Sequence, residues 1–168
     1  IMGFLPGITT PAGMTHQAIE DIAVMRTIPN MTVIETGDAT EVESICEQAD
    51  SVDGPVYCRI LRGGVPRLFD SPLKIGEIRI LNSGSDILLM TSGICTEEAL
   101  RARAALISQG ISILHLHIHT FKPFNEDKIL DLISNIKLGV ITMENHLVNG
   151  GLGTIISEII SKHGLSKK

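Results

Sequence analysis

The sequence has no tryptophan and one tyrosine, and aromatic residues make up only 3% of it. That scarcity argues against a surface on which the bases of single-stranded nucleic acid would stack. Basic clusters are also missing: the largest is the pair Lys167-Lys168, and the net charge is −5. We therefore expect neither nucleic acid nor an anionic membrane surface as a partner.

Cysteines and long apolar runs are scarce as well. Cys46, Cys58 and Cys95 are odd in number, far apart and without metal-ligand spacing. We expect buried, reduced thiols rather than a disulfide framework or a metal site. The apolar runs are too short to span a bilayer and no signal peptide opens the chain, which favours a cytoplasmic protein. Because the chain begins at Ile1, we expect a piece of a longer protein.

Hydrophobic residues make up 43% of the chain, enough to predict a large buried core. Apolar strands alternate with amphipathic helices, which is typical of α/β proteins with mainly parallel sheets and flanking helices. The predicted strands cover residues 31–35, 56–61, 77–81, 86–90, 111–119 and 138–143. Helices are predicted from about Thr15 to Pro29, over 39–49, over 96–108 with Thr96 as its cap, after a capping Asn125, and after Gly153.

A stretch without periodicity divides the chain. Residues 63–74 contain Pro66 and Pro72 and show neither a helical nor a strand pattern. We predict one unit over 1–64, a linker over 65–75 and a second unit over 76–168. We expect the second unit to be incomplete, because its sheet could take another strand after the last helix.

Several short motifs, taken in order, resemble the transketolase family across nearly the whole chain. They are Thr15-His16-Gln17, Arg59-Ile60-Leu61-Arg62-Gly63, Glu144-Asn145-His146 and Gly150-Gly151-Leu152-Gly153. Each motif is weak alone, whereas their order and spacing together are specific. The resemblance implies part of a pyrimidine-binding domain followed by a transketolase C-terminal-like domain.

The resemblance also implies thiamine diphosphate and Mg²⁺ as cofactors, bound at a dimer interface. The diphosphate-binding domain and the glutamate that protonates the aminopyrimidine ring normally lie upstream of the matching segment. We therefore expect no cofactor-binding or metal-binding residue in this chain, and a diphosphate-binding domain or subunit as its partner in a homo-oligomer or heterotetramer. Gly37-Asp38-Ala39 departs from the family's Gly-Asp-Gly motif and is interpreted as a turn before a helix.

His16 is the first candidate for chemistry. At the predicted N-terminus of a helix, backbone N–H groups and the helix dipole favour anions, and an imidazole can bind a sugar hydroxyl or a developing oxyanion. A solvent-exposed histidine at a helix start is the alternative. The resemblance implies that this histidine reaches the reacting carbon of the donor, so a catalytic and substrate-binding role is predicted for His16.

Arg62 is the second candidate. It follows the predicted strand 56–61, and ligand residues usually follow strands in parallel sheets. A guanidinium binds phosphate through two hydrogen bonds, although a solvated arginine would fit the same position. The resemblance implies that Arg62 contacts the phosphate of a sugar phosphate substrate.

Two positions depart from the family pattern. Relatives carry Gly-Glu-Asp-Gly where this chain has Thr10-Pro11-Ala12-Gly13, and Ala12 cannot bind a sugar hydroxyl. Phe4 stands where a phosphate-contacting histidine is usual, and its ring cannot donate to phosphate. These departures leave the choice of sugar open, while the reaction class stands.

Histidines alternate in the predicted strand 111–119, which puts His115, His117 and His119 on one face. Neighbours on that face lie about 7 Å apart, too far for all three to bind one metal. A polar sheet end or interface is therefore favoured over a metal site. In Glu144-Asn145-His146 and the glycines that follow, tight packing and orientation of the neighbouring unit are favoured over an anion cradle.

The resemblance implies transfer of a two-carbon ketol unit from a ketose (phosphate) to an aldose (phosphate), with the isolated chain inactive. Deoxyxylulose-phosphate synthase and the beta subunits of 2-oxo acid dehydrogenases are alternatives with the same cofactor. A non-catalytic assembly or ligand-binding module is an alternative of another class, because this chain lacks the cofactor site.

Overall fold

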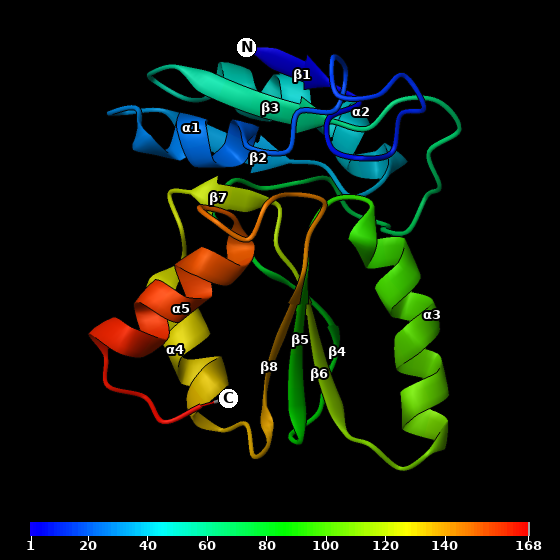
Figure 1. Cartoon of the computed structure of the whole chain (residues 1–168), viewed down its shortest axis with the longest axis vertical. Coiled ribbons are helices and arrows are strands. Elements are labelled where there is room, and N and C mark those ends of the chain that lie inside the picture. The colour runs from blue at the N-terminus through cyan, green and yellow to red at the C-terminus, as the bar shows by residue number, and fades with distance from the viewer. Residues whose placement is uncertain (168) are drawn as a thin grey trace.

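The computed structural model describes residues 1–167 and contains two α/β units, one above the other in Figure 1, each built on a four-stranded sheet. The first sheet has the order β1-β3-β2-β7 and consists of β1 (Met2–Phe4), β3 (Val56–Ile60), β2 (Thr32–Glu35) and β7 (Thr120–Lys122). The second has the order β4-β6-β5-β8 and consists of β4 (Arg79–Asn82), β6 (Ile113–His117), β5 (Ile87–Thr91) and β8 (Gly139–Met143).

Both sheets are mainly parallel, as predicted. β3 pairs in parallel with β1 and β2, and β5 pairs in parallel with β6 and β8. Each sheet ends in one antiparallel edge strand, β7 in the first and β4 in the second. The predicted strands 77–81 and 86–90 follow each other in sequence, but β6 lies between them in the sheet.

Five helices flank the sheets in the part of the chain that the structure describes. They are α1 (Asp21–Thr27), α2 (Ala39–Asp50), α3 (Cys95–Ser108), α4 (Glu126–Ser134) and α5 (Leu152–Lys162). Figure 1 shows α3 on one face of the second sheet and α4 with α5 on the other. Asn125 caps α4 as predicted, because its side-chain oxygen accepts a hydrogen bond from the Lys128 N–H at 3.2 Å.

Two predicted helix starts are wrong. The first helix begins at Asp21 rather than near Thr15, because residues 15–20 form turns and bends. Thr96 does not cap α3, which begins at Cys95 after Ile94. The Thr96 hydroxyl is instead buried and lies 2.7 Å from Nδ1 of His117, so it serves tertiary structure.

The strand β7 was not predicted, and it joins the two units. It follows β6 closely and pairs with β2 of the first sheet, on the far side of that sheet from β1. A segment beyond the linker thus completes the first sheet. The boundary predicted at 65–75 divides the sequence but does not divide the sheets, and it stays a prediction.

The largest hydrophobic core is shared by the two units. It contains Ile22, Val33 and Tyr57 from the first unit together with Met90 and Leu116 from the second. Smaller cores lie between α2 and the first sheet and between α3 and the second. Because each fully buried aliphatic side chain contributes about 1.5–3 kcal/mol, the shared core holds the units firmly together.

The structure bears on two predictions, those about membrane-spanning segments and about the cysteines. Within residues 1–167, no helix combines the length and apolar character needed to cross a membrane. All three cysteines are free, but only Cys58 is buried: Cys46 is exposed and Cys95 is half-buried, so the expectation of three buried thiols is wrong for Cys46 and holds only in part for Cys95. Cys46 lies on the solvent side of α2, whose other face packs on the first sheet.

Candidate functional site

A pocket lies where three parallel strands of the first sheet end. β1, β2 and β3 are followed there by Leu5, Gly37 and Arg62, and all three residues line the pocket. The second unit contributes the opposite wall through Ile94 and Glu97 at the start of α3. The carboxyl edge of parallel strands is the usual ligand-binding edge of an α/β sheet, which makes this pocket the candidate site.

The backbone beside Arg62 is held by a hydrogen bond, whereas the Arg62 side chain has no bonding partner in the described part of the chain. The preceding residue is held by a hydrogen bond from the Leu61 N–H to Oγ1 of Thr36, at 3.3 Å. The Arg62 side chain is exposed and forms no hydrogen bond or ion pair with any of residues 1–167. Glu97 across the pocket already pairs with Arg101. Arg62 is therefore free to bind an anion that enters the pocket.

His16 is not among the residues that line this pocket. It is exposed in a turn where its N–H donates to the Gly13 carbonyl at 2.9 Å, and its Nδ1 lies 2.9 Å from the Thr15 hydroxyl. Because α1 begins five residues later, the predicted placement of His16 at a helix N-terminus is wrong. A helix dipole therefore does not favour anion binding at His16. The catalytic and substrate-binding role that the resemblance implies for His16 stays a prediction.

The two positions that depart from the family pattern are both exposed. Phe4 is 64% exposed at the end of β1, and Ala12 lies in the same loop as His16. The Ala12 N–H donates to the Thr10 hydroxyl at 3.3 Å, so its backbone shapes the loop although its methyl group binds nothing polar.

Asp38 is committed to structure and does not fit a diphosphate or magnesium site. One carboxylate oxygen accepts the N–H of Glu41 at 2.8 Å and so caps α2. The other accepts the N–H groups of Leu68 and Phe69, each at 2.9 Å. The interpretation of Gly37-Asp38-Ala39 as a turn before a helix is confirmed.

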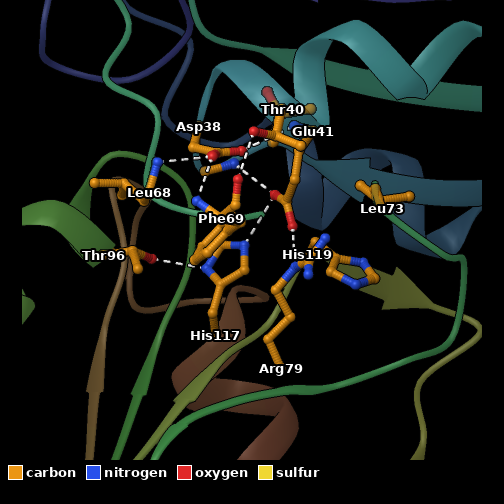
Figure 2. A network of polar contacts seen from close by, with 12 residues as sticks. Asp38, Thr40, Glu41, Leu68, Phe69, Leu73, Arg79, Thr96, His117 and His119 are labelled. Carbon is orange, nitrogen blue, oxygen red and sulfur yellow. Dashed lines mark hydrogen bonds and ion pairs between the residues drawn. The ribbon is translucent and has the colours of Figure 1, made fainter. Parts of the chain in front are cut away.

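A buried polar network connects the two units at Glu41 (Figure 2). Its carboxylate lies 3.0 Å from Nε2 of His117 and accepts the Arg79 Nε–H at 2.8 Å and the Gly37 N–H at 2.9 Å. Burial alone would raise the pKa of Glu41, but His117, His119 and the Gly37 N–H lower that pKa to about 2. Glu41 is therefore a charged residue held inside the protein by partners from both units.

The other two histidines of the series are also buried. His115 lies 3.0 Å from the Thr91 hydroxyl and His119 lies 2.9 Å from the Thr120 hydroxyl. Burial lowers the pKa of each to about 4, so both are neutral near pH 7. Residues 1–167 hold no group of three or more histidine, cysteine and carboxylate side chains that could bind a metal. The prediction of a polar interface is confirmed for His117, which bonds Glu41 of the first unit, while His115 bonds within the second unit.

Arg59 is a structural hub that the sequence analysis did not single out. Its side chain is 1% exposed and pairs with Asp21 at 2.9 Å and with Glu35. It also donates to the backbone carbonyl of Asn145, at 2.9 Å, and thereby joins the second unit to β3 of the first. The sequence feature that could have revealed this structural role is an arginine within an otherwise apolar strand.

The motif Glu144-Asn145-His146 also joins the units. Glu144 accepts the N–H groups of Leu152 and Gly153, at 2.6 and 2.8 Å, and so binds the first turn of α5. His146 receives a longer bond from the Ala23 N–H of α1, at 3.4 Å. The predicted packing role is confirmed at Glu144, and contact with the neighbouring unit is made by His146 and Asn145 rather than by Glu144.

Sequence comparison defines the class of protein. Residues 1–66 match the family profile "Transketolase, pyrimidine binding domain" and residues 76–168 match "Transketolase, C-terminal domain". The chain belongs to the transketolase family. Members of this family are enzymes that use thiamine diphosphate.

Individual relatives show how much of such a protein is present. The chain is 38% identical to the 6-deoxy-6-sulfo-D-fructose transketolase subunit of Clostridium sp. (strain MSTE9), covering 97% of this chain and 51% of the relative. It is 35% identical to 1-deoxy-D-xylulose-5-phosphate synthase of Rippkaea orientalis, covering 95% of this chain and 26% of that one. A solved "Split gene transketolase, inactive beta4 tetramer" is similar with a TM-score of 0.86, 34% identity, and 96% and 52% coverage. The chain spans about half the length, or less, of the relatives it matches.

Proposed function

We propose that this chain is the C-terminal part of a transketolase-like enzyme that transfers a two-carbon ketol unit from a ketose (phosphate) to an aldose (phosphate). Residues 1–64 contribute to the pyrimidine-binding domain, 65–75 form a linker, and 76–168 form the C-terminal domain. Arg62 binds the distal phosphate of the substrate. His16 contacts the reacting part of the donor.

The observation that carries this proposal is the position of Arg62. It stands at the carboxyl edge of three parallel strands, lines a pocket and has no partner among residues 1–167. A free guanidinium at such an edge suits a phosphate, which it can bind through two hydrogen bonds. The relative from Clostridium supports the class of reaction, because its name describes a transketolase subunit.

Thiamine diphosphate, when bound, supplies the carbanion and the electron sink that ketol transfer requires. Asp38 of Gly37-Asp38-Ala39 does not fit the cofactor's diphosphate or magnesium site, because three backbone N–H groups already donate to the Asp38 carboxylate. We propose that both groups are held mainly by a diphosphate-binding domain or subunit. The similar split-gene transketolase supports an assembly of separate subunits, either a homo-oligomer or a heterotetramer.

The test is kinetic and uses the enzyme assembled with its remaining part and the cofactor. Arg62→Ala should raise KM for a phosphorylated acceptor by roughly 10- to 100-fold, with a smaller effect on an unphosphorylated acceptor. Arg67→Ala is the matched control, because Arg67 is exposed and pairs with Glu43 outside the pocket. Equal kinetics for the two variants would refute the role of Arg62.

The products distinguish the alternatives that share the cofactor. Ketol transfer releases a shortened aldose, whereas a synthase or dehydrogenase acting on a 2-oxo acid releases carbon dioxide. No turnover of either kind by the assembled enzyme would leave the assembly or ligand-binding module as the function.

A further inference from the structure

One buried side chain of the second unit holds the loop that carries His16. Asn145 follows β8 and is 8% exposed. Its side-chain oxygen accepts the Ile8 N–H at 3.0 Å, and its side-chain nitrogen donates to the Pro6 carbonyl at 3.4 Å. These contacts span more than 130 residues of sequence, so the second unit fixes the place where the chain leaves β1.

The two ends of the loop 7–18 are bonded to each other close to Asn145. The Gly7 N–H donates to the Ala18 carbonyl at 2.6 Å, which brings together the two ends of the loop 7–18. Arg59 donates both to that carbonyl, at 3.2 Å, and to the backbone carbonyl of Asn145. The base of the loop is therefore tied to Asn145 directly and through Arg59.

The fit between Gly7 and Asn145 is close enough to restrict both residues. Gly7 has a φ of +82°, and a Cβ at this position would lie 2.0 Å from the Asn145 side-chain nitrogen. Only a residue without a side chain can occupy this place. Asn145 is itself fixed, because the neighbouring Glu144 is bonded to the start of α5.

Beyond its base, the loop is held chiefly by its own bonds. Gln17 donates to the Thr10 carbonyl at 2.7 Å, and the His16 N–H donates to Gly13. Thr9, near the base, lines the pocket that contains Arg62. The orientation of the whole loop toward the pocket is thus set at its base.

We propose that Asn145 is a positioning residue that aligns the His16 loop with the pocket at the carboxyl edge of the first sheet. The role requires an amide, because the same side chain must accept from Ile8 and donate to Pro6. An aspartate would keep the first bond and lose the second. The kinetic part of this inference rests on the proposed function, whereas its structural part does not.

The structural test is hydrogen exchange in the complete enzyme that contains this chain. Asn145→Ala should speed exchange of the Ile8 amide and of residues 9–18 by about tenfold or more, with β2 and β3 still protected, and Asn145→Asp should have an intermediate effect. Asn135→Ala is the control, because Asn135 is exposed at the end of α4 and bonds only within that region. Unchanged loop exchange in Asn145→Ala would overturn the inference, and folded Asn145→Asp covers the case in which Asn145→Ala does not fold.

The kinetic test is a double-mutant cycle with His16. Asn145→Ala should lower kcat by about 10- to 100-fold, and it should have little further effect in a His16→Ala background. Additive losses would overturn the claim that Asn145 acts through His16. If His16→Ala alone leaves kcat unchanged, the proposed role of His16 fails, while hydrogen exchange still decides whether Asn145 holds the loop.

Discussion

The carboxyl edges of the two sheets have opposite surroundings. In the first sheet, the strand ends lead to Leu5, Gly37 and Arg62, which line a pocket. In the second, β6 ends at His117 and β8 is followed by Glu144 and Asn145, and these residues bind the first unit or the start of α5. The edge at which an α/β sheet usually binds ligands thus lines a pocket in the first unit, with Ile94 and Glu97 of the second unit beside it, whereas in the second unit it serves mainly as an interface.

The difference shows how similar residues acquire different roles. At the second edge, polar groups are buried, and His117 is bonded by Glu41 of the other unit. At the first edge, Arg62 is exposed and free. Substitutions at the interface should therefore cost stability, whereas those at the pocket should cost activity. The predictions below test that contrast.

Among single substitutions, the largest effect is expected from Arg59. Arg59→Met would leave Asp21 and Glu35 buried without their cation, which should lower the free energy of unfolding by about 3–5 kcal/mol. Urea denaturation measures the loss. The control Arg67→Met removes an exposed pair with Glu43 and should cost less than about 1 kcal/mol. Similar losses would contradict the distinction between buried and exposed arginines.

A smaller loss is expected from Asp38, which lies at the open edge but serves structure. Asp38→Ala removes the cap of α2 and the acceptor for the N–H groups of Leu68 and Phe69. The free energy of unfolding should fall by about 2–3 kcal/mol. Asp38→Asn keeps one acceptor oxygen and should recover part of the loss in the same denaturation assay. Full stability of Asp38→Ala would show that these bonds are dispensable.

Acid should weaken the interface. Burial holds the pKa of His115 and His119 at about 4 in the folded chain, below the ordinary value of 6.5. The unfolded chain therefore takes up protons first, and stability should fall from about pH 6.5 down to pH 4. The lowered pKa of Glu41, about 2 instead of 4.5, adds a loss below pH 4.5.

The size of this effect follows from the same values. We expect the free energy of unfolding to fall by roughly 5–6 kcal/mol between pH 7 and pH 4, about 3 kcal/mol for each histidine. His119→Gln should remove part of that fall in urea denaturation measured across this range. His16→Gln removes an exposed histidine and is the control. A flat profile in the parent chain would contradict the burial of neutral histidines at the junction.

The smallest effect on stability is expected at the pocket. Arg62→Ala should change the free energy of unfolding by less than about 0.5 kcal/mol, because the side chain is exposed and has no partner among residues 1–167. Thermal unfolding beside the kinetic test would separate binding from folding. A loss comparable to that of Arg59→Met would show that Arg62 is structural.

Much of the fold could be predicted because its signals are local. The apolar run 56–61, the cap at Asn125 and the isoleucines of α5 each specify an element through near neighbours in sequence. The start of α1 was misplaced because apolar residues continue upstream of Asp21, where bonds at Gly7 and Arg59 hold the chain in turns. Those bonds come from distant residues and leave no periodic pattern.

The candidate site was predictable in part for the same reason. Arg62 could be found because a residue after a parallel strand lies at the ligand edge whatever its distant contacts are. The burial of Arg59 and the contact between Asn145 and Ile8 could not, because each depends on how the two units pack. The three histidines showed a shared face, but Glu41 and Thr91, the partners of His117 and His115, are distant in sequence and appear only in three dimensions.

The strand β7 has a consequence for synthesis on the ribosome. When residues 1–66 have emerged, β2 still lacks its outer neighbour, because Thr120–Lys122 has not been translated. At about 5–20 residues per second, this strand edge stays unpaired for several seconds, which exposes it to chance pairing with other nascent chains. The first unit thus reaches its native sheet only after about half of the second has left the exit tunnel.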